Sequence, residues 1–209
     1  MPDVISDPDI EMGVFGNQVR MITPTVSRTD EVPLDDWRSA DAVMGWHTLH
    51  YDQALIDKLD NCKIIIRIGV GFENVDLQSA GERGIIVANV PDYGTTDVAD
   101  HAIALLLSFS RGIFAYSATV MDNQWTWEHI STLKRLAGSN MGIIGLGRIG
   151  TAAAMRAKGL GMKVLFYDPY LKEGVDKSLG IERSYKLPDL LGQSDVVSIH
   201  TPLTDETKN

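Results

Sequence analysis

The feature that constrains this chain most is a glycine-rich run from Gly145 to Gly150, with the sequence GLGRIG. It follows an apolar, strand-like segment at 141–145 and precedes an Ala-rich, helix-like segment at 149–160. The next strand-like segment, 163–167, leads into Asp168, which lies 18 residues after the last glycine. Strand, glycine turn and helix in this order predict a parallel βαβ unit, and a later strand is predicted at 195–200.

Each glycine in the run has a distinct physical reason. Gly145 permits a tight turn, Gly147 lets a pyrophosphate approach the backbone, and Gly150 lets the helix pack closely on the strand. The helix N-terminus presents free N–H groups and the positive end of its dipole to an anion. Asp168 can accept hydrogen bonds from the adenosine ribose and repels a 2′-phosphate, so the motif predicts NAD rather than NADP. The alternative is a glycine-rich helix cap beside a surface aspartate.

The N-terminal half alternates short β-branched runs with helix-like stretches, which predicts a parallel α/β sheet of about five strands. The run at 64–68 is apolar on both faces and is predicted to be the central strand. We therefore expect one domain over 1–112 and a second over 113–209, with 112–138 crossing between them. The predicted strands of the first domain are 4–6, 19–23, 42–46, 63–69 and 85–90.

The helix-like stretch at 97–111 is dense in apolar residues, so we expect it to be almost wholly buried, with His101 as a structural histidine. Trp125 and Trp127 in the crossing segment are expected to serve in packing or subunit contact.

A second candidate site lies at the strand ends of the first domain. Gly69 and Gly71 follow the central strand, where open α/β sheets place their ligands, and a backbone anion nest is expected there. Arg67 and His47 lie at similar strand ends, so the cleft is suited to a carboxylate. Each residue also has a structural alternative, since a strand-end Arg can cap a carbonyl and a lone His can be a satisfied polar group.

Composition excludes several classes of protein. The net charge of −9 disfavours a nucleic-acid or membrane-surface partner. One cysteine, Cys62, rules out an internal disulfide and a thiolate zinc site, and no metal site is expected. The chain has no apolar run of 18 residues and its start lacks a signal-peptide pattern, so a cytoplasmic location is expected. Phosphate-loop, nucleophile-elbow and zinc-helix motifs are absent from the sequence.

Several motifs together resemble the D-isomer-specific 2-hydroxyacid dehydrogenases, and most closely the branch of the C-terminal-binding-protein corepressors and their bacterial relatives. The resemblance covers nearly the whole chain, and the stretch at 92–95 (DYGT) is similar to the bacterial enzymes rather than to the animal corepressors. The motifs are IIRIGVGFENVD at 65–76, NVP at 89–91 with VAD at 98–100, GLGRIG at 145–150, VLFYDPYL at 164–171 and SDVVSIHTPL at 194–203.

The resemblance implies a flavodoxin-like substrate domain, a Rossmann NAD-binding domain and a homodimer. It implies that NAD-dependent reduction of a small 2-oxo acid to a D-2-hydroxy acid is the activity. The residues that it places at substrate are His47, Arg67, Val70 and Gly71. The residues that it adds to the glycines and Asp168 at NAD are Val98, Arg148, Ile149, Thr201, Pro202 and Leu203.

The same resemblance places the catalytic Arg, Glu and His on later strands and loops, so no catalytic residue is assigned within 1–209. We expect an N-terminal fragment whose Rossmann domain is incomplete, which binds the adenosine end weakly at best and does not turn over substrate. The alternative function is an NAD(H)-sensing binding protein similar to the corepressors. A third interpretation is a Rossmann protein of another chemistry, such as a hydrolase of adenosyl compounds.

Overall fold

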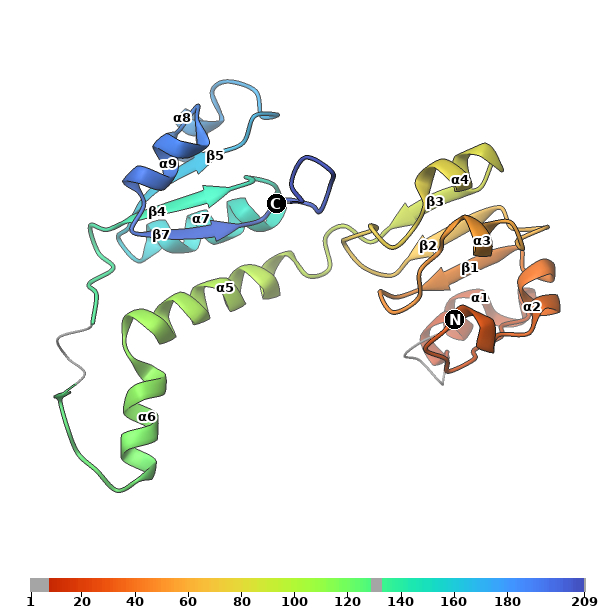
Figure 1. Cartoon of the computed structure of the whole chain (residues 1–209), viewed down its shortest axis with the longest axis horizontal. Helices are drawn as coiled ribbons and strands as arrows, with labels where there is room; N and C mark the ends of the chain where they lie inside the picture. The colour runs from red at the N-terminus through yellow and green to blue at the C-terminus, as the bar shows by residue number, and fades with distance from the viewer. Residues whose placement is uncertain (1–7, 129–132, 209) are drawn as a thin grey trace. The chain divides into compact units, whose positions relative to one another are not determined.

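A computed structural model describes residues 8–128 and 133–208, and it separates into two compact units, Met1–Tyr93 and Gly94–Asn209 (Figure 1). Each unit contains its own parallel sheet, with three strands in the first and four in the second. The predicted α/β class with two parallel sheets is confirmed. The division falls at Gly94, however, before the long helix that the sequence analysis placed in the first domain.

The reason for this difference is the packing of α5 (Thr95–Ser110). Its residues Ala99, Ile103 and Leu106 are buried in the core of the second unit. Arg156 of α7 (Arg148–Gly159) also pairs with Asp100. The helix therefore belongs to the second unit, and the crossing between the units precedes it.

The first unit is built on strands β1 (Ala42–Gly45), β2 (Ile64–Arg67) and β3 (Ile86–Asn89), all parallel. The order β1-β2-β3 confirms the central position predicted for the apolar run of β2. The predicted strand at 19–23 is not a strand, and the one at 4–6 lies outside the described residues. The side chains of 19–22 line a cavity against β1 instead of adding a fourth strand to this sheet.

Short helices surround this sheet and bury Leu55, Ile56 and Ile65 almost completely. Asp52 and Asp76 begin two of the helices by accepting hydrogen bonds from Leu55 N (2.9 Å) and Ser79 N (3.0 Å), as N-cap residues do. The helical elements are α1 (Asp9–Phe15), η1 (Gly16–Gln18), η2 (Thr29–Glu31), α2 (Leu34–Ser39), α3 (Gln53–Ile56) and α4 (Leu77–Glu82).

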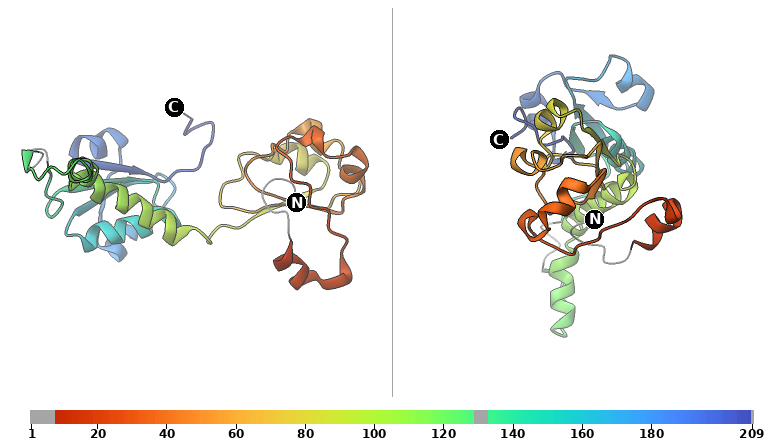
Figure 2. Two further views of the ribbon diagram at one scale, coloured as in Figure 1. Left: turned by 90° about the horizontal axis from the view of Figure 1, so that it is seen from below. Right: turned by 90° about the vertical axis from the view of Figure 1, so that its right-hand side faces the viewer.

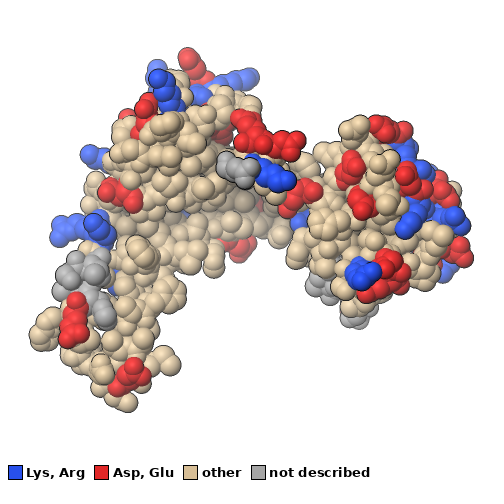
Figure 3. Space-filling view, in the orientation of Figure 1, with Lys and Arg blue, Asp and Glu red and all other residues tan. Residues whose placement is uncertain are grey.

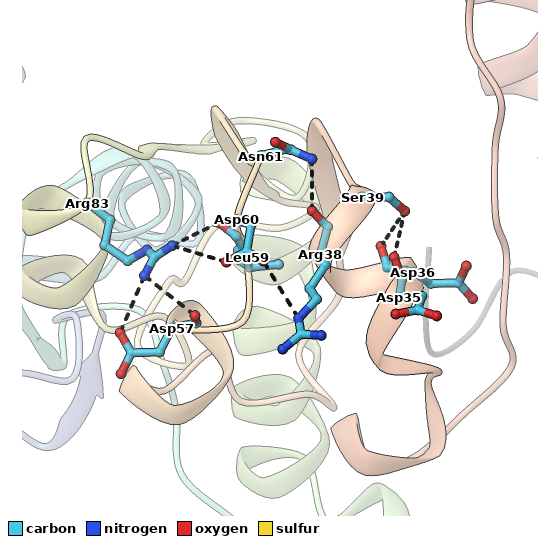
Figure 4. Close-up of polar contacts among 9 residues, drawn as sticks. All are labelled: Asp35, Asp36, Arg38, Ser39, Asp57, Leu59, Asp60, Asn61 and Arg83. Atoms are coloured by element: carbon cyan, nitrogen blue, oxygen red, sulfur yellow. Dashed lines mark hydrogen bonds and ion pairs between the residues drawn. The ribbon is translucent and has the colours of Figure 1, made fainter.

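Two arginines connect these short elements at the surface (Figure 4). Arg83, just after α4, donates to the carbonyl of Leu59 (3.3 Å) and lies near the carboxylates of Asp57 and Asp60. Arg38 of α2 pairs with Asp60 at 3.6 Å. Both arginines have acidic partners within reach, which distinguishes them from Arg67, described below.

The second unit has the strand order β6-β5-β4-β7, all parallel. Its strands are β4 (Asn140–Ile144), β5 (Lys163–Tyr167), β6 (Glu182–Arg183) and β7 (Val196–Ile199). Its other helices are α6 (Ile113–Met121), α8 (Val175–Leu179) and α9 (Leu187–Gln193). The strands predicted at 141–145, 163–167 and 195–200 and the helix predicted at 149–160 are therefore confirmed to within one residue at each end.

Alternation along β4 separates the two layers of helices that cover this sheet (Figure 2). Met141 and Ile143 join the core formed with the alanines of α7. Gly142 points to the other face, where a β-carbon would lie 2.7 Å from a methyl group of Leu190 in α9. The period of two along a strand thus places α7 on one face of the sheet and α9 on the other.

The expectation that α5 is almost wholly buried is wrong. His101 is exposed, and Leu105 and Phe109 are 52% and 84% exposed. An apolar run shows that a helix has hydrophobic residues, but one face of α5 packs on the second unit and the other remains open. A structural role for His101 inside the core is excluded accordingly.

The segment after α5 also exposes apolar residues. Helix α6 contains no charged residue, and its surface is largely uncharged (Figure 3). Trp125 and Trp127 are 90% and 73% exposed, so neither packs inside this unit. Within 8–128 and 133–208, no single helix is long and apolar enough to cross a membrane, although α5 and α6, bent by 63°, meet that test together. One face of α5, with Ala99, Ile103 and Leu106, is buried in the core of the second unit.

Candidate functional site

The glycine-rich run of the second unit forms the connection from β4 to α7. Because Ile144 of β4 is in register with Tyr167 of β5, Gly145 and Asp168 leave the sheet side by side. Gly145 N donates to Tyr167 O at 2.9 Å, and Gly145 has a φ of +85°, a conformation that favours glycine. The predicted tight turn is therefore present at the carboxyl edge of the sheet.

Two of the three glycines are required by the protein's own backbone. A β-carbon on Gly145 would lie 3.0 Å from the carbonyl oxygen of His200 and 2.9 Å from a methyl group of Thr201. A β-carbon on Gly150 would overlap the carbonyl oxygen of Gly145. Backbone atoms cannot move aside as side chains do, so these positions exclude larger residues.

Gly147 has a different reason. No atom of the described protein lies within 4 Å of where its β-carbon would be, and its φ of −73° suits any residue. It precedes α7 as the N-cap residue and provides no side-chain hydrogen bond to the helix. The first N–H groups of a helix have no partners within it, so this surface is suited to an anion approaching the backbone.

Asp168 is half-buried and already holds backbone groups with both oxygens. Oδ2 accepts from Leu146 N, inside the glycine loop, and Oδ1 accepts from Tyr170 N, each at 3.0 Å. The sequence predicts a ribose contact for Asp168 but gives no sign of this role in fixing the loop. A carboxylate has about four acceptor positions, so two remain for the hydroxyls of a ribose.

Arg183 is a further residue of the site that the sequence analysis did not identify. Its Nη2 donates to the carbonyl oxygens of Asp168 (2.9 Å) and Leu171 (2.8 Å), and its Nη1 donates to that of Lys172 (3.1 Å). Its guanidinium also lies over the ring of Phe166. The arginine fixes the turn after β5, and a 2′-phosphate would have to compete with three carbonyls for it. It comes from the two-residue strand β6, which left no recognisable sequence pattern.

The turn after β7 lies beside the glycine loop, as the contact of Thr201 with Gly145 shows. Pro202 and Leu203 are exposed in this turn. Arg148 is exposed and Ile149 half-buried at the start of α7.

Val98 lies on α5 and is 46% exposed. The structure thus brings the three glycines, Asp168 and Thr201 together, while a cofactor role of Val98, Arg148, Ile149, Pro202 and Leu203 stays a prediction.

His200, at the end of β7, is another group at this edge that the sequence analysis did not single out. Its ring Nε2 shares a hydrogen bond of 2.8 Å with the hydroxyl of Ser198, and its backbone N–H donates to Ile144 O at 2.8 Å. Burial lowers the pKa of His200, because the charged imidazolium loses water. Burial therefore favours the neutral imidazole.

In the first unit, Arg67 at the end of β2 is only 7% exposed. Its Nη1 donates to Ile68 O at 2.9 Å, and its side chain fills the place where a β-carbon on Gly69 would be. Its Nε is buried and has no hydrogen-bond partner, and no carboxylate pairs with it among the described residues. Buried charges are normally paired, so this guanidinium is prepared for an anion.

The loop after Arg67 also offers hydrogen-bond donors that have no partner among the described residues. Among the described residues, the backbone N–H groups of Val70 and Gly71 have no acceptor, while Val70 O accepts from the side chain of Asn89 at 2.8 Å. Neither Gly69 nor Gly71 has a positive φ, so the loop lacks the left-handed residue of a backbone nest. The carboxylate of Glu73 lies over Gly71. The predicted nest is corrected to a pair of unpartnered N–H groups beside a buried arginine.

His47 is exposed on the bend that follows β1. The amide of Asn74 holds this bend by donating to Trp46 O (3.1 Å) and Leu49 O (2.7 Å). A cavity of about 510 Å³ in this unit lies between the segment at 15–24 and β1, and none of the predicted substrate residues lines it. No group of three or more potential metal-ligating side chains occurs in the part of the chain that the structure describes.

The strand order, the glycine turn and Asp168 define the second unit as an α/β domain of the dinucleotide-binding class. A family model described as "D-isomer specific 2-hydroxyacid dehydrogenase, NAD binding domain" matches residues 103–209, about half of the chain. The chain belongs to the D-isomer specific 2-hydroxyacid dehydrogenase family. The match begins within α5, in agreement with the position of that helix in the second unit.

Individual relatives support this membership. The chain is 32% identical over 208 residues to C-terminal-binding protein 1 of Caenorhabditis elegans, covering 97% of this chain and 29% of that protein. It is 34% identical over 207 residues to D-3-phosphoglycerate dehydrogenase of Methanocaldococcus jannaschii, covering 99% and 39%. A D-lactate dehydrogenase from Aquifex aeolicus, solved with NAD and lactic acid, is 28% identical with a TM-score of 0.89, covering 99% and 61%. The chain thus spans about a third of the length of these curated relatives.

Proposed function

We propose that this protein is an NAD-dependent oxidoreductase that reduces a small 2-oxo acid to a D-2-hydroxy acid. The observation that carries the proposal is Gly147, a glycine that the fold does not require, at the open N-terminus of α7 beside Asp168. A bound nicotinamide would supply the hydride, and the protein's task is then to aim it and to hold the acid.

The contacts of the second unit support assignment of the adenosine end. The N-terminus of α7 faces the diphosphate, and Asp168 accepts from the ribose hydroxyls. The preference for NAD over NADP rests on the Asp168 charge and on Arg183, whose N–H groups are occupied by carbonyls. In this proposal Arg148, Ile149, Thr201, Pro202 and Leu203 flank the cofactor, and Val98 lines the nicotinamide side.

The first unit is proposed to bind the substrate carboxylate. Arg67 offers a buried guanidinium with an unpartnered Nε, and Val70 and Gly71 offer two backbone N–H groups. Together they form a donor-rich surface of the kind that carboxylates bind. His47 lies two residues after Gly45, which is in register with Arg67, and it is proposed as a further contact. The D-lactate dehydrogenase relative was solved with NAD and lactic acid, which supports the proposed classes of cofactor and substrate.

Calorimetric titration of the 209-residue chain with NADH, NADPH and ADP-ribose tests the cofactor assignment. We expect NADH and ADP-ribose to bind, and we expect the affinity for NADPH to be lower by about tenfold or more. Gly147→Val is expected to lower the affinity for NADH and for ADP-ribose about tenfold or more. The melting temperature should stay unchanged, because the new side chain meets only open space. Gly192→Ala, at another glycine with no neighbour within 4 Å, is the matched control and keeps wild-type affinity.

Wild-type protein that binds none of the three nucleotides overturns the proposal. Equal affinity of Gly147→Val and wild type removes its main support. For turnover, the protein as it occurs in its source organism is assayed for NADH oxidation with pyruvate, glyoxylate and hydroxypyruvate, and no oxidation with any 2-oxo acid contradicts the reaction assigned.

A second candidate function is that of an NAD(H)-sensing binding protein. The observation that favours it is the 32% identity to C-terminal-binding protein 1, which is named for binding rather than for a reaction. The same glycine loop and Asp168 would then hold the dinucleotide as a signal. NADH-dependent association of two chains without oxidation of NADH distinguishes this function from the reductase.

We also propose a homodimer, supported by the exposed apolar residues Ile113, Phe114, Val120 and Met121 of α6. Apolar surface of this kind is commonly buried in a protein interface. Sedimentation velocity tests it: Phe114→Glu is expected to shift a dimer to monomer, and a monomeric wild type contradicts the proposal.

A further inference from the structure

A side-chain contact joins two loops at the carboxyl edge of the second sheet. The hydroxyl of Tyr170 donates a hydrogen bond to the carboxylate Oε2 of Glu206. Tyr170 lies three residues beyond β5, and Glu206 lies in the turn that follows β7. The two residues are 36 positions apart in sequence, so the contact belongs to the tertiary structure.

The strand order shows what this contact spans. Strands β5 and β7 are not neighbours, because β4 lies between them. Adjacent strands are about 4.8 Å apart, so the two loops start roughly 10 Å from each other. Between these two loops lies the glycine loop, which begins with Gly145 at the end of β4. The phenol and the carboxylate therefore bridge the segments on either side of the glycine loop.

Both ends of the bridge are fixed at the backbone, while its side chains are exposed. Tyr170 N donates to Asp168 Oδ1, and Thr207 Oγ1 braces the other loop by donating to Pro202 O at 2.6 Å. The Tyr170 side chain is nevertheless 77% exposed, and Glu206 is exposed as well. Nothing packs over the contact, so it can open without unfolding either loop.

The charge at this contact disfavours an incoming dinucleotide. The carboxylates of Asp168 and Glu206 both act on the Tyr170 hydroxyl, and together they raise its pKa, with the hydrogen bond to Glu206 as the largest cause. A diphosphate brought to the start of α7 adds further negative charge at the same edge. Like charges in close proximity repel, so Glu206 favours the bridged form and opposes the anion.

Resting on the proposed dinucleotide function, we propose that the Tyr170–Glu206 contact is a strap that closes the adenosine edge of the site. The strap has to open before a diphosphate reaches the N-terminus of α7. A hydrogen bond to a charged group is stronger than a neutral one, and exposure to water reduces its net worth. The closed form is then favoured by a factor of about two to ten, which lowers the apparent affinity by about three- to elevenfold.

Stopped-flow fluorescence of NADH binding to the 209-residue chain tests the strap. Tyr170→Phe removes the hydrogen bond, and Glu206→Gln replaces its charged acceptor with a neutral one. Both side chains are exposed, so folding is preserved. We expect each variant to bind NADH faster and up to about three- to elevenfold tighter, and the double variant to gain no more than the better single one. The matched controls are Tyr185→Phe, another exposed tyrosine, and Asp205→Asn, which removes a neighbouring negative charge without touching the strap.

Unchanged or slower association in Tyr170→Phe overturns the strap, since that variant alters no charge. A gain in Asp205→Asn equal to that in Glu206→Gln also overturns it, because net charge alone then explains the rates. If the wild-type chain binds no NADH at all, the proposed function itself fails. The strap fails alone when wild type binds and the variants match it.

Discussion

Each unit of this protein has a glycine-rich loop at the end of a central strand, after β2 in the first unit and after β4 in the second. The glycines serve different purposes in the two loops. In the second unit, Gly145 and Gly150 are required by backbone geometry, through a positive φ and a backbone oxygen. In the first unit, Gly69 and Gly71 have ordinary φ values, and the space of their missing β-carbons is filled by Arg67 and Glu73 side chains. One loop is shaped by the main chain and the other makes room for charged groups.

This difference predicts which loop tolerates change. A backbone obstacle cannot move without distorting the fold, whereas the end of a flexible side chain can rotate away. Substitutions of Gly145 and Gly150 in the second unit should therefore reduce stability, and those in the loop of the first unit should chiefly disturb the charged groups. The following variants test this contrast, from the largest expected effect to the smallest.

Gly150→Ala is expected to destabilise the second unit by about 3 kcal/mol or more, because its β-carbon would overlap the carbonyl oxygen of Gly145. Hydrogen exchange of peptides from β4 and β5 measures the loss within that unit alone. Gly159→Ala, in the same helix with no neighbour within 4 Å, is the control and should stabilise slightly through helix propensity. Equal protection in the two variants would show that the helix does not need this close approach.

Arg67→Met is expected to stabilise the first unit by about 1–2 kcal/mol, since it removes a buried, unpaired charge and keeps an apolar stem of similar length. Arg83→Met should instead destabilise by about 1 kcal/mol, because Arg83 caps Leu59 O and lies near two carboxylates (Figure 4). Urea denaturation of both variants gives the comparison. Destabilisation by Arg67→Met would mean that Arg67 serves the fold, and its proposed role with substrate would lose its basis.

Gly69→Ala should cost about 1 kcal/mol, because its β-carbon would displace only the end of the Arg67 side chain. In an Arg67→Ala background the same substitution should cost nothing, since the obstacle is gone. A double-mutant cycle by urea denaturation measures this coupling. An undiminished cost in the Arg67→Ala background would place the obstacle in the backbone and erase the contrast between the two loops.

The contrast also shows what could be predicted from the sequence. The glycine spacing and Asp168 predicted the βαβ unit. They also predicted that the glycine loop and Asp168 lie side by side, because neighbouring parallel strands end at the same edge of the sheet. The run at 64–68 gave a central strand, because apolar residues on both faces need cover on both sides. Each of these inferences depends on neighbours in sequence.

The rest depends on contacts between distant residues, which periodicity does not report. The apolar composition of α5 could not show which unit it joins or that Phe109 remains exposed. Arg183 reaches the turn after Asp168 from a strand of two residues, and Tyr170 meets Glu206 across another strand. The segment at 19–23 has the composition of a strand, but its side chains line a cavity.

The smallest effect concerns pH and again separates the units, because His200 belongs to the second. Burial lowers the pKa of His200 in the folded chain, so the unfolded chain takes up a proton at higher pH than the folded one. Stability from this residue is therefore complete above the unfolded pKa of about 6.5 and is lost as the pH falls through the folded value. His200→Gln should flatten this dependence in β4 and β5 peptides and leave that of β2 unchanged, as hydrogen exchange at pH 5 to 8, corrected for intrinsic rates, can show. An unaltered slope in the second unit would mean that the imidazole is as well hydrated in the folded chain as in the unfolded one.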